Sequence, residues 1–247
     1  MLTESTRPTT RVFLCDTDTL TSRPSDSALR HLLGNSEHQR LSRYQGKRYR
    51  EFLHSRLLLR DALSSTLPGT LPPAHWQITE RPEQAPLVHQ AVEAGWYYSL
   101  AHSRGIIAAV ISNDGPCGID LEYQRQRTNI TELAEQWFHP SETELLATLT
   151  DHERTAVFYR LWTMKEALIK AKGSSVFSGI LARSHFVPCN PADEGNDLYA
   201  HSLELSAAPF SLAIVCRHLP ADVTQGYPLT TAKKITPVMT TYIIHQS

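Results

Sequence analysis

The predicted elements of this 247-residue chain follow the order strand, helix, strands, and this order occurs once before about residue 115 and again after it. In its first occurrence, this order consists of an apolar strand at 11–15 and leucine-rich helical sequence over 37–63, in one broken helix or two. Strands rich in aromatic and β-branched residues follow at 96–101 and 106–112. No sequence repeat is visible, but the repeated order predicts an α+β fold with two similar halves.

The second occurrence of this order starts with a strand at 118–122 and continues with helical sequence from about residue 130. Ser141 and Glu144 form a capping-box signature, which predicts a new helix directly after Pro140. An apolar stripe at helical spacing then predicts a long helix with one buried face, ending at Gly173. The stripe consists of Val157, Leu161, Met164, Leu168 and Ala171. The last predicted strands are at 185–188, 198–205 and 210–216.

Domain boundaries follow from this order. The N-terminal half is expected over 1–115 and the C-terminal half over 116–219. Residues 220–247 are polar and are expected to form a peripheral tail. The acidic strand at 118–122 opens the second half, which places its carboxylates near the junction of the halves.

Two acidic motifs contain the candidate residues for binding a metal ion and phosphate. Residues 118–122 read Gly-Ile-Asp-Leu-Glu, and because side chains two apart on a strand share a face, Asp120 and Glu122 lie on one side. In the motif over 162–170, helical spacing puts Glu166 and Lys170 on one face, with Lys165 beside them. The three carboxylates suit a hard ion such as Mg²⁺, and nearby lysines suit phosphate.

Each motif taken alone has a purely structural explanation. Asp120 and Glu122 then form the solvated edge of a half-buried strand, and Glu166 with Lys170 forms an i,i+4 ion pair worth roughly 0.3–0.5 kcal/mol. That explanation does not account for Trp162 or for the two motifs occurring together. Their combination favours a metal and phosphate site.

Composition excludes several classes of protein. Apolar residues make up 41%, charged residues 20%, and the formal net charge is −1, so no global basic field favours nucleic acid. The first ten residues are polar, unlike a signal peptide, and no run approaches the ~20 apolar residues of a membrane span. The four cysteines lack zinc-site spacing and are expected to be reduced thiols. We expect a cytoplasmic globular protein that binds neither nucleic acid nor membranes.

The two motifs resemble the signatures of the 4′-phosphopantetheinyl transferases, specifically the larger surfactin-synthetase-activating (Sfp) type. The family signatures are similar to G-[IV]-D-[ILV]-E and W-x-x-K-E-A-x-x-K, which correspond here to residues 118–122 and 162–170. Residues 100–103, Leu-Ala-His-Ser, resemble the S-H-S segment of the family, and further similarity covers most of 39–216.

The resemblance implies a fold of two similar α/β halves related by pseudo-twofold symmetry, with coenzyme A in the cleft between them. It implies Mg²⁺-dependent transfer of the 4′-phosphopantetheine arm of coenzyme A to a serine of an apo acyl or peptidyl carrier protein. The other product is 3′,5′-ADP, and Mn²⁺ is an alternative metal ion. A chain that contains both halves assembles the cleft within one molecule, so a monomer is expected.

Carried over residue by residue, the resemblance assigns Asp120, Glu122 and Glu166 to the metal. Lys165 and Lys170 are implied to contact the phosphates, and Lys165 is included with Glu166 among the catalytic residues. Glu166 is expected to act as the general base, directly or through a metal-bound water, because related enzymes use the glutamate of that motif in this way.

Basic residues in the first half complete the implied coenzyme A site. Arg56 and His102 are implied to hold the 3′-phosphate, with Arg40 and Arg43 near the mouth of the site. Other basic residues between 40 and 60 are normally a solvated helix face, but they also suit electrostatic steering of an acidic carrier protein.

The chain departs from the family pattern at two points. Residues 84–86 read Gln-Ala-Pro where many relatives have Gly-Lys-Pro, which removes a basic contact; Arg81 is a candidate replacement. Ala101 replaces the first serine of the S-H-S segment and removes a hydroxyl donor. Both departures predict weaker contacts to coenzyme A.

Two other functions stay open on the sequence. One is another Mg²⁺-dependent transferase or hydrolase of a nucleotide diphosphate, which would bind coenzyme A poorly. The other is a non-catalytic module that binds a carrier protein or coenzyme A. All three carboxylates and both motif lysines are present, which favours the enzyme.

Overall fold

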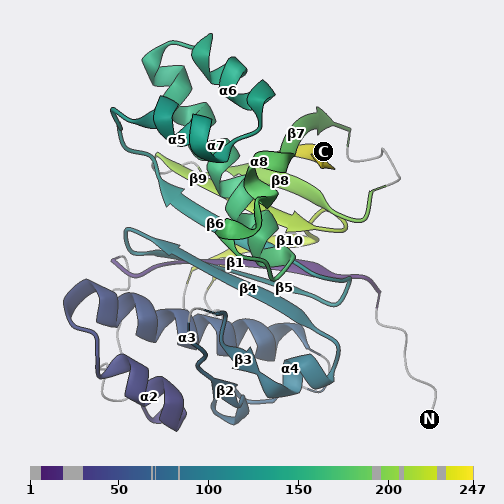
Figure 1. Ribbon diagram of the computed structural model, residues 1–247. Helices are drawn as coiled ribbons and strands as arrows, with labels where there is room; N and C mark the ends of the chain where they lie inside the picture. The colour runs from purple at the N-terminus through teal and green to yellow at the C-terminus, as the bar shows by residue number, and fades with distance from the viewer. Residues whose placement is uncertain are drawn as a thin grey trace. The chain divides into compact units, whose positions relative to one another are not determined.

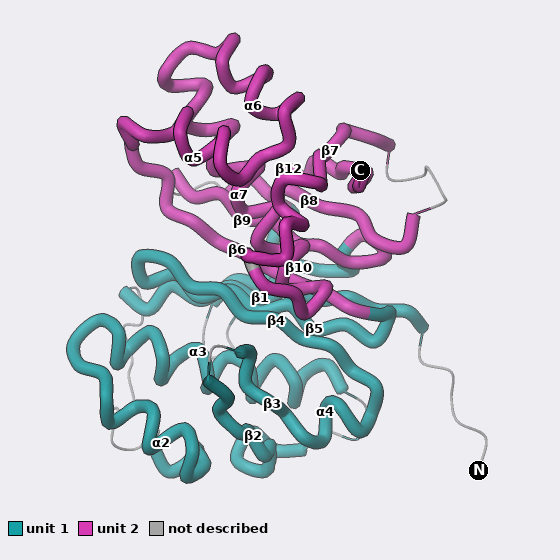
Figure 2. The backbone as a smooth tube through the Cα atoms, in the orientation of Figure 1, with its two compact units in different colours: residues 1–115, 220–236 teal, residues 116–219, 237–247 magenta. Residues whose placement is uncertain are grey.

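In this computed structural model the described residues are 7–18, 30–67, 69, 71–82, 84–190, 196–205, 209–226 and 232–246 (Figure 1). The chain divides into two compact units (Figure 2). The first comprises residues 1–115 and 220–236, and the second comprises 116–219 and 237–247. Each unit contains a five-stranded sheet and a helix of 21 residues.

The sheet of the first unit has the strand order β11-β10-β1-β5-β4. Its strands are β1 (Thr10–Asp16), β4 (Tyr97–Ser103), β5 (Ile106–Ser112), β10 (Asp222–Gln225) and β11 (Lys233–Ile235). Strands β4 and β5 form an antiparallel hairpin, β5 pairs antiparallel with β1, and β10 pairs parallel with β1. Helix α3 (Gly46–Thr66) covers this sheet through a core that includes Leu59, Leu63, Phe13 and Ile107.

Shorter elements surround helix α3. They are η1 (Arg30–Leu32), α2 (Asn35–Leu41), η2 (Pro73–His75), β2 (Ile78–Thr79), β3 (Leu87–Val88) and α4 (His89–Glu93). Helical sequence over 37–63 therefore forms two helices, α2 and α3. A buried ion pair joins them, because the Arg60 guanidinium donates to both carboxylate oxygens of Glu37 at 2.7 and 2.6 Å.

The sheet of the second unit has the order β6-β9-β8-β12-β7, with every pairing antiparallel. Its strands are β6 (Gly118–Tyr123), β7 (Ser184–Cys189), β8 (Tyr199–Glu204), β9 (Phe210–Cys216) and β12 (Val238–Gln246). Helix α7 (Asp151–Ala171) packs on β6, β9 and β8. The remaining helices are α5 (Ile130–Trp137), α6 (Pro140–Ala147), η3 (Val176–Ser178) and α8 (Ile180–Arg183).

The two units share one sequence of connections. In the first, β1 is followed by α3 and by the hairpin β4-β5, whose second strand pairs with β1. In the second, β6 is followed by α7 and by the hairpin β8-β9, whose second strand pairs with β6. The predicted α+β class with two similar halves is confirmed.

The expectation of a peripheral tail over 220–247 is wrong for the described residues. Strand β10 extends the first sheet beside β1, and β12 lies between β8 and β7 in the second sheet. Tyr242 of β12 is buried and belongs to the core of the second unit. Averaging over 220–247 concealed β12, whose sequence Val-Met-Thr-Thr-Tyr-Ile-Ile is itself rich in β-branched and apolar residues typical of a strand.

The predicted cap of helix α6 is also wrong, although the helix is present. His139, not Ser141, is the N-cap residue, and its ring accepts a hydrogen bond from the Ser141 amide. Glu142, not Glu144, completes the box by accepting from the His139 amide at 3.3 Å. The first turn therefore starts at Pro140, where the fixed φ of proline favours a helix start.

The two longest helices, α3 and α7, carry charged side chains along their length, including Arg56, Arg60 and Glu166. None of the helices in the described ranges combines the length and the apolar character needed to cross a membrane.

Gly118 is the point of closest approach between β6 and α7. A Cβ atom at this position would lie 1.9 Å from the Ala167 carbonyl oxygen and 2.6 Å from the Ala171 amide nitrogen. Both are backbone atoms of the helix, so no side-chain rotation can make room. Glycine is required here because the helix backbone occupies the space of a side chain.

We expect Gly118→Ala to lower the free energy of unfolding by about 3 kcal/mol, because the added methyl group displaces the backbone of α7 from β6. Urea denaturation followed by tryptophan fluorescence measures this loss. Gly34→Ala is the matched control: its Cβ would meet its nearest atom at 3.4 Å, and we expect a loss below about 1 kcal/mol. Equal losses in the two variants would contradict the steric explanation.

His201 is a buried titratable group in the middle of the second sheet. The residue is 2% exposed, and its Nδ1 lies 3.1 Å from the Thr241 hydroxyl. Nε2 is buried without a hydrogen-bond partner among the described residues. Burial lowers the pKa of His201 from 6.5 to about 4, so the folded protein keeps the ring neutral.

Because the unfolded chain binds this proton more readily, stability is retained above pH 6.5 and is lost as the pH falls from 6.5 towards 4. We expect His201 to account for a loss of roughly 2 kcal/mol between pH 7 and pH 5. Urea unfolding of His201→Gln at both pH values should show a smaller decrease in the free energy of unfolding from pH 7 to pH 5. The exposed control His152→Gln should behave as the unchanged protein. An unaltered pH dependence in His201→Gln would refute this role.

Candidate metal and phosphate site

The two acidic motifs contact each other in the second unit. The Lys170 ammonium on α7 donates to Asp120 Oδ1 at 2.8 Å and to the Ile119 carbonyl oxygen at 3.0 Å, both on β6. The close approach at Gly118 makes these contacts possible, since it brings the last turns of α7 onto the strand. Lys170 keeps 31% of its side chain exposed.

The carboxylates of both motifs influence one another. Burial raises the pKa of Glu166, and the negative charges of Asp120 and Glu122 raise it further. Burial likewise raises the pKa of Glu122, and Asp120 adds to the effect. Like charges at short range are costly, and the ammonium of Lys170 offsets part of this cost by lowering the pKa of both glutamates.

The donor set fits a hard divalent ion. Asp120 Oδ2 is buried and accepts no hydrogen bond from the described residues. Carboxylate oxygens of this kind are the ligands that Mg²⁺ prefers. Across the described ranges, no three acidic, histidine or cysteine side chains already converge on one point. Asp120, Glu122 and Glu166 accordingly do not form a ready-made set of three ligands in this part of the chain.

Lys165 does not lie with these residues, and its expected contact with phosphate is wrong. Its side chain is 0% exposed, and its ammonium lies 2.7 Å from Glu142 Oε2 of α6. It also donates to the carbonyl oxygens of Leu181 and Ser184 at 2.7 and 2.6 Å. Burial lowers the pKa of Lys165 and raises the pKa of Glu142, while the opposite charge of each partner offsets these shifts.

Arg56 is also engaged within the protein, contrary to the expected contact with a 3′-phosphate. Its guanidinium donates to both carboxylate oxygens of Glu80, at 2.5 and 2.9 Å, and to the Ser55 hydroxyl at 3.1 Å. The side chain is buried in the first unit. This bidentate pair holds the loop that carries Glu80 against α3.

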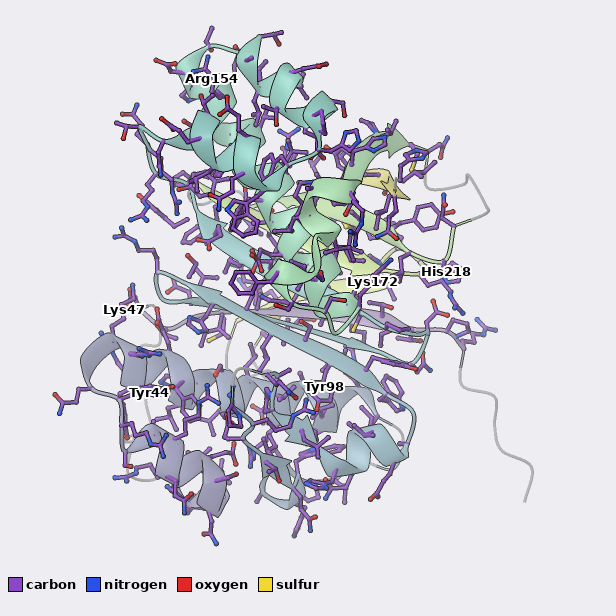
Figure 3. The ribbon with its side chains drawn as sticks, viewed as in Figure 1. Tyr44, Lys47, Tyr98, Arg154, Lys172 and His218 are labelled. Carbon is purple, nitrogen blue, oxygen red and sulfur yellow. The ribbon has the colours of Figure 1, made fainter. Side chains whose placement is uncertain are left out.

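Arg40 and Arg43 line a pocket of about 340 Å³ in the first unit. The other lining residues are Ser36, Gln39, Tyr44, Glu80, Arg81 and Pro82. Arg40 donates to Glu80 at 3.1 Å and, at 3.2 Å, to the hydroxyl of Tyr44. Tyr44 is labelled in Figure 3. Its hydrogen bond with Arg40, together with the charges of Arg40 and Arg48, lowers the pKa of Tyr44. Three arginine residues and one carboxylate, that of Glu80, line this pocket.

His102 lies on β4 and is exposed over 53% of its side chain. Its Nδ1 is 3.6 Å from the Glu51 carboxylate, which also lies 3.8 Å from the Lys47 ammonium. Ala101, the neighbouring departure from the family pattern, is buried in the sheet. His102 therefore remains accessible to a ligand.

Three residues have a structural role that the sequence alone does not show. Gly118 was part of a motif, but only the distance to α7 shows why glycine is needed. Arg81 was a candidate replacement for a missing lysine, and it lines the pocket with Arg40 and Arg43. Glu142 is not singled out by the sequence, because its burial beside Lys165 has no local sequence signal.

Comparisons with known proteins agree with this arrangement of motifs. The family model described as the 4′-phosphopantetheinyl transferase superfamily matches residues 116–232. A putative 4′-phosphopantetheinyl transferase of Synechocystis sp. is 34% identical over 175 residues, which cover 70% of this chain and 68% of that protein. The chain therefore belongs to the 4′-phosphopantetheinyl transferase superfamily.

Two further relatives match over shorter stretches. The 4′-phosphopantetheinyl transferase AcpT of Escherichia coli (strain K12) is 32% identical over 133 residues, covering 54% of this chain and 63% of AcpT. The 4′-phosphopantetheinyl transferase Sfp of Bacillus subtilis is 29% identical over 137 residues, covering 52% of this chain and 59% of Sfp. The chain thus aligns with somewhat less than two thirds of either protein.

Proposed function

We propose that this protein transfers the 4′-phosphopantetheine arm of coenzyme A to a serine hydroxyl of an apo carrier protein, in a Mg²⁺-dependent reaction that releases 3′,5′-ADP. Family membership supports the reaction class. The observation that carries the proposal for this chain is the buried oxygen Oδ2 of Asp120. It has no hydrogen-bond partner among the described residues, and the charge of Asp120 acts on the carboxyl groups of Glu122 and Glu166.

Asp120, Glu122 and Glu166 would hold the metal ion. When bound, Mg²⁺ neutralises negative charge on the pyrophosphate and on the departing phosphate. Lys170, already placed beside Asp120 at 2.8 Å, supplies a second positive charge from the protein itself. Positioning and electrostatic stabilisation dominate phosphoryl chemistry, so the site needs little covalent participation from the chain.

Glu166 is the proposed general base. The attacking serine must lose its hydroxyl proton, and a carboxylate accepts a proton more readily when its pKa is raised. Burial and the charge of Asp120 raise the pKa of Glu166, which supports this role. Glu166 would accept the proton on a carboxylate oxygen as the serine oxygen attacks phosphorus.

The pocket lined by Arg40, Arg43 and Arg81 is proposed to bind the phosphate-bearing nucleotide part of coenzyme A. Arginine guanidinium groups suit phosphate because they donate in a fixed fork. His102, exposed on β4, is proposed to contact the 3′-phosphate. Arg56 acts indirectly, because it holds Glu80, which in turn orients Arg40.

The reaction is tested by intact mass spectrometry of several purified apo carrier proteins after incubation with this protein, coenzyme A and Mg²⁺. We expect a gain of about 340 Da, the mass of the transferred arm. The gain should disappear with EDTA and in Asp120→Asn. Coenzyme A binding without any labelling would instead support a non-catalytic binding module, and absence of both would support an enzyme of another nucleotide diphosphate.

We expect Glu166→Gln to lower the rate of carrier labelling by at least about 100-fold, because the amide cannot accept the serine proton and is a weaker metal ligand. The affinity for coenzyme A, measured by isothermal titration calorimetry, should change little. Glu135→Gln, at an exposed position on α5, is the matched control. Labelling by Glu166→Gln at a near-normal rate would rule out Glu166 as the base.

A further inference from the structure

The Lys165 ammonium is enclosed by groups that complement its charge. Three oxygen atoms accept its hydrogen bonds, from Glu142 Oε2 and from the carbonyl groups of Leu181 and Ser184. Nζ also lies over the rings of Phe138 and Phe186, at 5.1 and 5.5 Å from their centroids. Three acceptors use the full donor capacity of an ammonium group, so Lys165 has none left for a substrate.

These contacts join α7 to three other elements of the second unit. Glu142 belongs to α6, Leu181 to α8, and Ser184 to the first position of β7. Glu142 also accepts from the His139 amide at the start of α6. One buried charge therefore holds α7 against elements that precede and follow it in the chain. Loss of either partner would leave a buried charge without compensation.

The position of Lys165 determines which way Glu166 points. Successive residues of an α-helix are 100° apart around its axis, so a fixed direction for Lys165 fixes the direction of Glu166. On another side of α7, Gly118 and the contact of Lys170 with Asp120 hold the helix to β6. Rotation of α7 about its axis is thus restrained by two separate sets of contacts.

We propose that Lys165 is a positioning residue that, through its buried contact with Glu142, fixes the rotation of α7 and so presents Glu166 to the carboxylates of β6. The inference rests on the proposed transferase function only for the role of Glu166. It differs from a direct contact with phosphate in two respects. It requires Glu142 as much as Lys165, and it predicts loss of turnover without loss of coenzyme A binding.

The test compares Lys165→Met, Lys165→Gln, Glu142→Gln and the double variant Glu142→Gln/Lys165→Met. Lys165→Met removes every donor, whereas Lys165→Gln keeps a neutral one. Lys172→Met is the matched control, since Lys172 lies at the end of the same helix, exposed, with its ammonium 2.8 Å from Gln246 (Figure 3). Carrier labelling supplies kcat and the KM for coenzyme A, and hydrogen exchange reports on α7.

We expect Lys165→Met to lower kcat on the order of 100-fold while the KM for coenzyme A stays within about twofold, because misplacement of a catalytic group affects turnover rather than binding. Lys165→Gln and Glu142→Gln should lie between this variant and the unchanged protein. The double variant should be no worse than Lys165→Met, since both changes break one interaction. Lys172→Met should behave as the unchanged protein.

A raised KM with unchanged kcat in Lys165→Met, or independent losses that multiply in the double variant, would overturn the inference. If Lys165→Met does not fold, kcat and the KM for coenzyme A of Lys165→Gln and Glu142→Gln are compared with those of the unchanged protein in its place. Hydrogen exchange separates this inference from the proposed function. If the unchanged protein labels no carrier, faster exchange around residue 166 in the Lys165 and Glu142 variants still supports the positioning role, and unchanged exchange refutes it.

Discussion

The contact between Gly118 and helix α7 is the constraint on which the rest of the candidate site depends. Because Gly118 has no side chain, the helix backbone occupies the place where a Cβ atom would lie. The helix is then close enough for Lys170 to reach both a backbone carbonyl and the carboxylate of Asp120 on β6. The motifs at 118–122 and 162–170, which are distant in the chain, thereby form one group of interacting charges. Glu166 of α7 belongs to this group, because, besides burial, the charges of Asp120, Lys170 and Glu122 shift its pKa.

Buried ion pairs fix the long helices of both units. Arg60 of α3 pairs with Glu37, and Lys165 of α7 pairs with Glu142. The side chains of Arg60 and Lys165 are almost completely buried. Desolvation makes such pairs expensive, so they are weak evidence for added stability. Their directional hydrogen bonds instead specify one orientation of the helix. In the second unit, that orientation determines where the neighbouring carboxylate points.

Prediction from the sequence succeeded where a segment is buried along its length. The strands at 106–112 and 210–216 coincide with β5 and β9, whose inner positions are all buried. It failed for β12, where only residues 241 and 242 are buried and both neighbouring strands supply the ladder contacts. The family resemblance also misplaced Lys165 and Arg56, because a match of motifs does not show which acidic side chain lies beside a basic one in the folded protein.

The sequence by itself determined the class of the protein, since residue type and spacing along a strand and a helix are local properties. The motifs at 118–122 and 162–170, in that order, identified the family and its acidic residues. Tertiary structure alone decided which basic residues remain accessible. Whether a lysine meets solvent or a buried carboxylate depends on elements far away in the chain. Lys170 consequently lies at the acidic group, while Lys165, five residues earlier, belongs to the core.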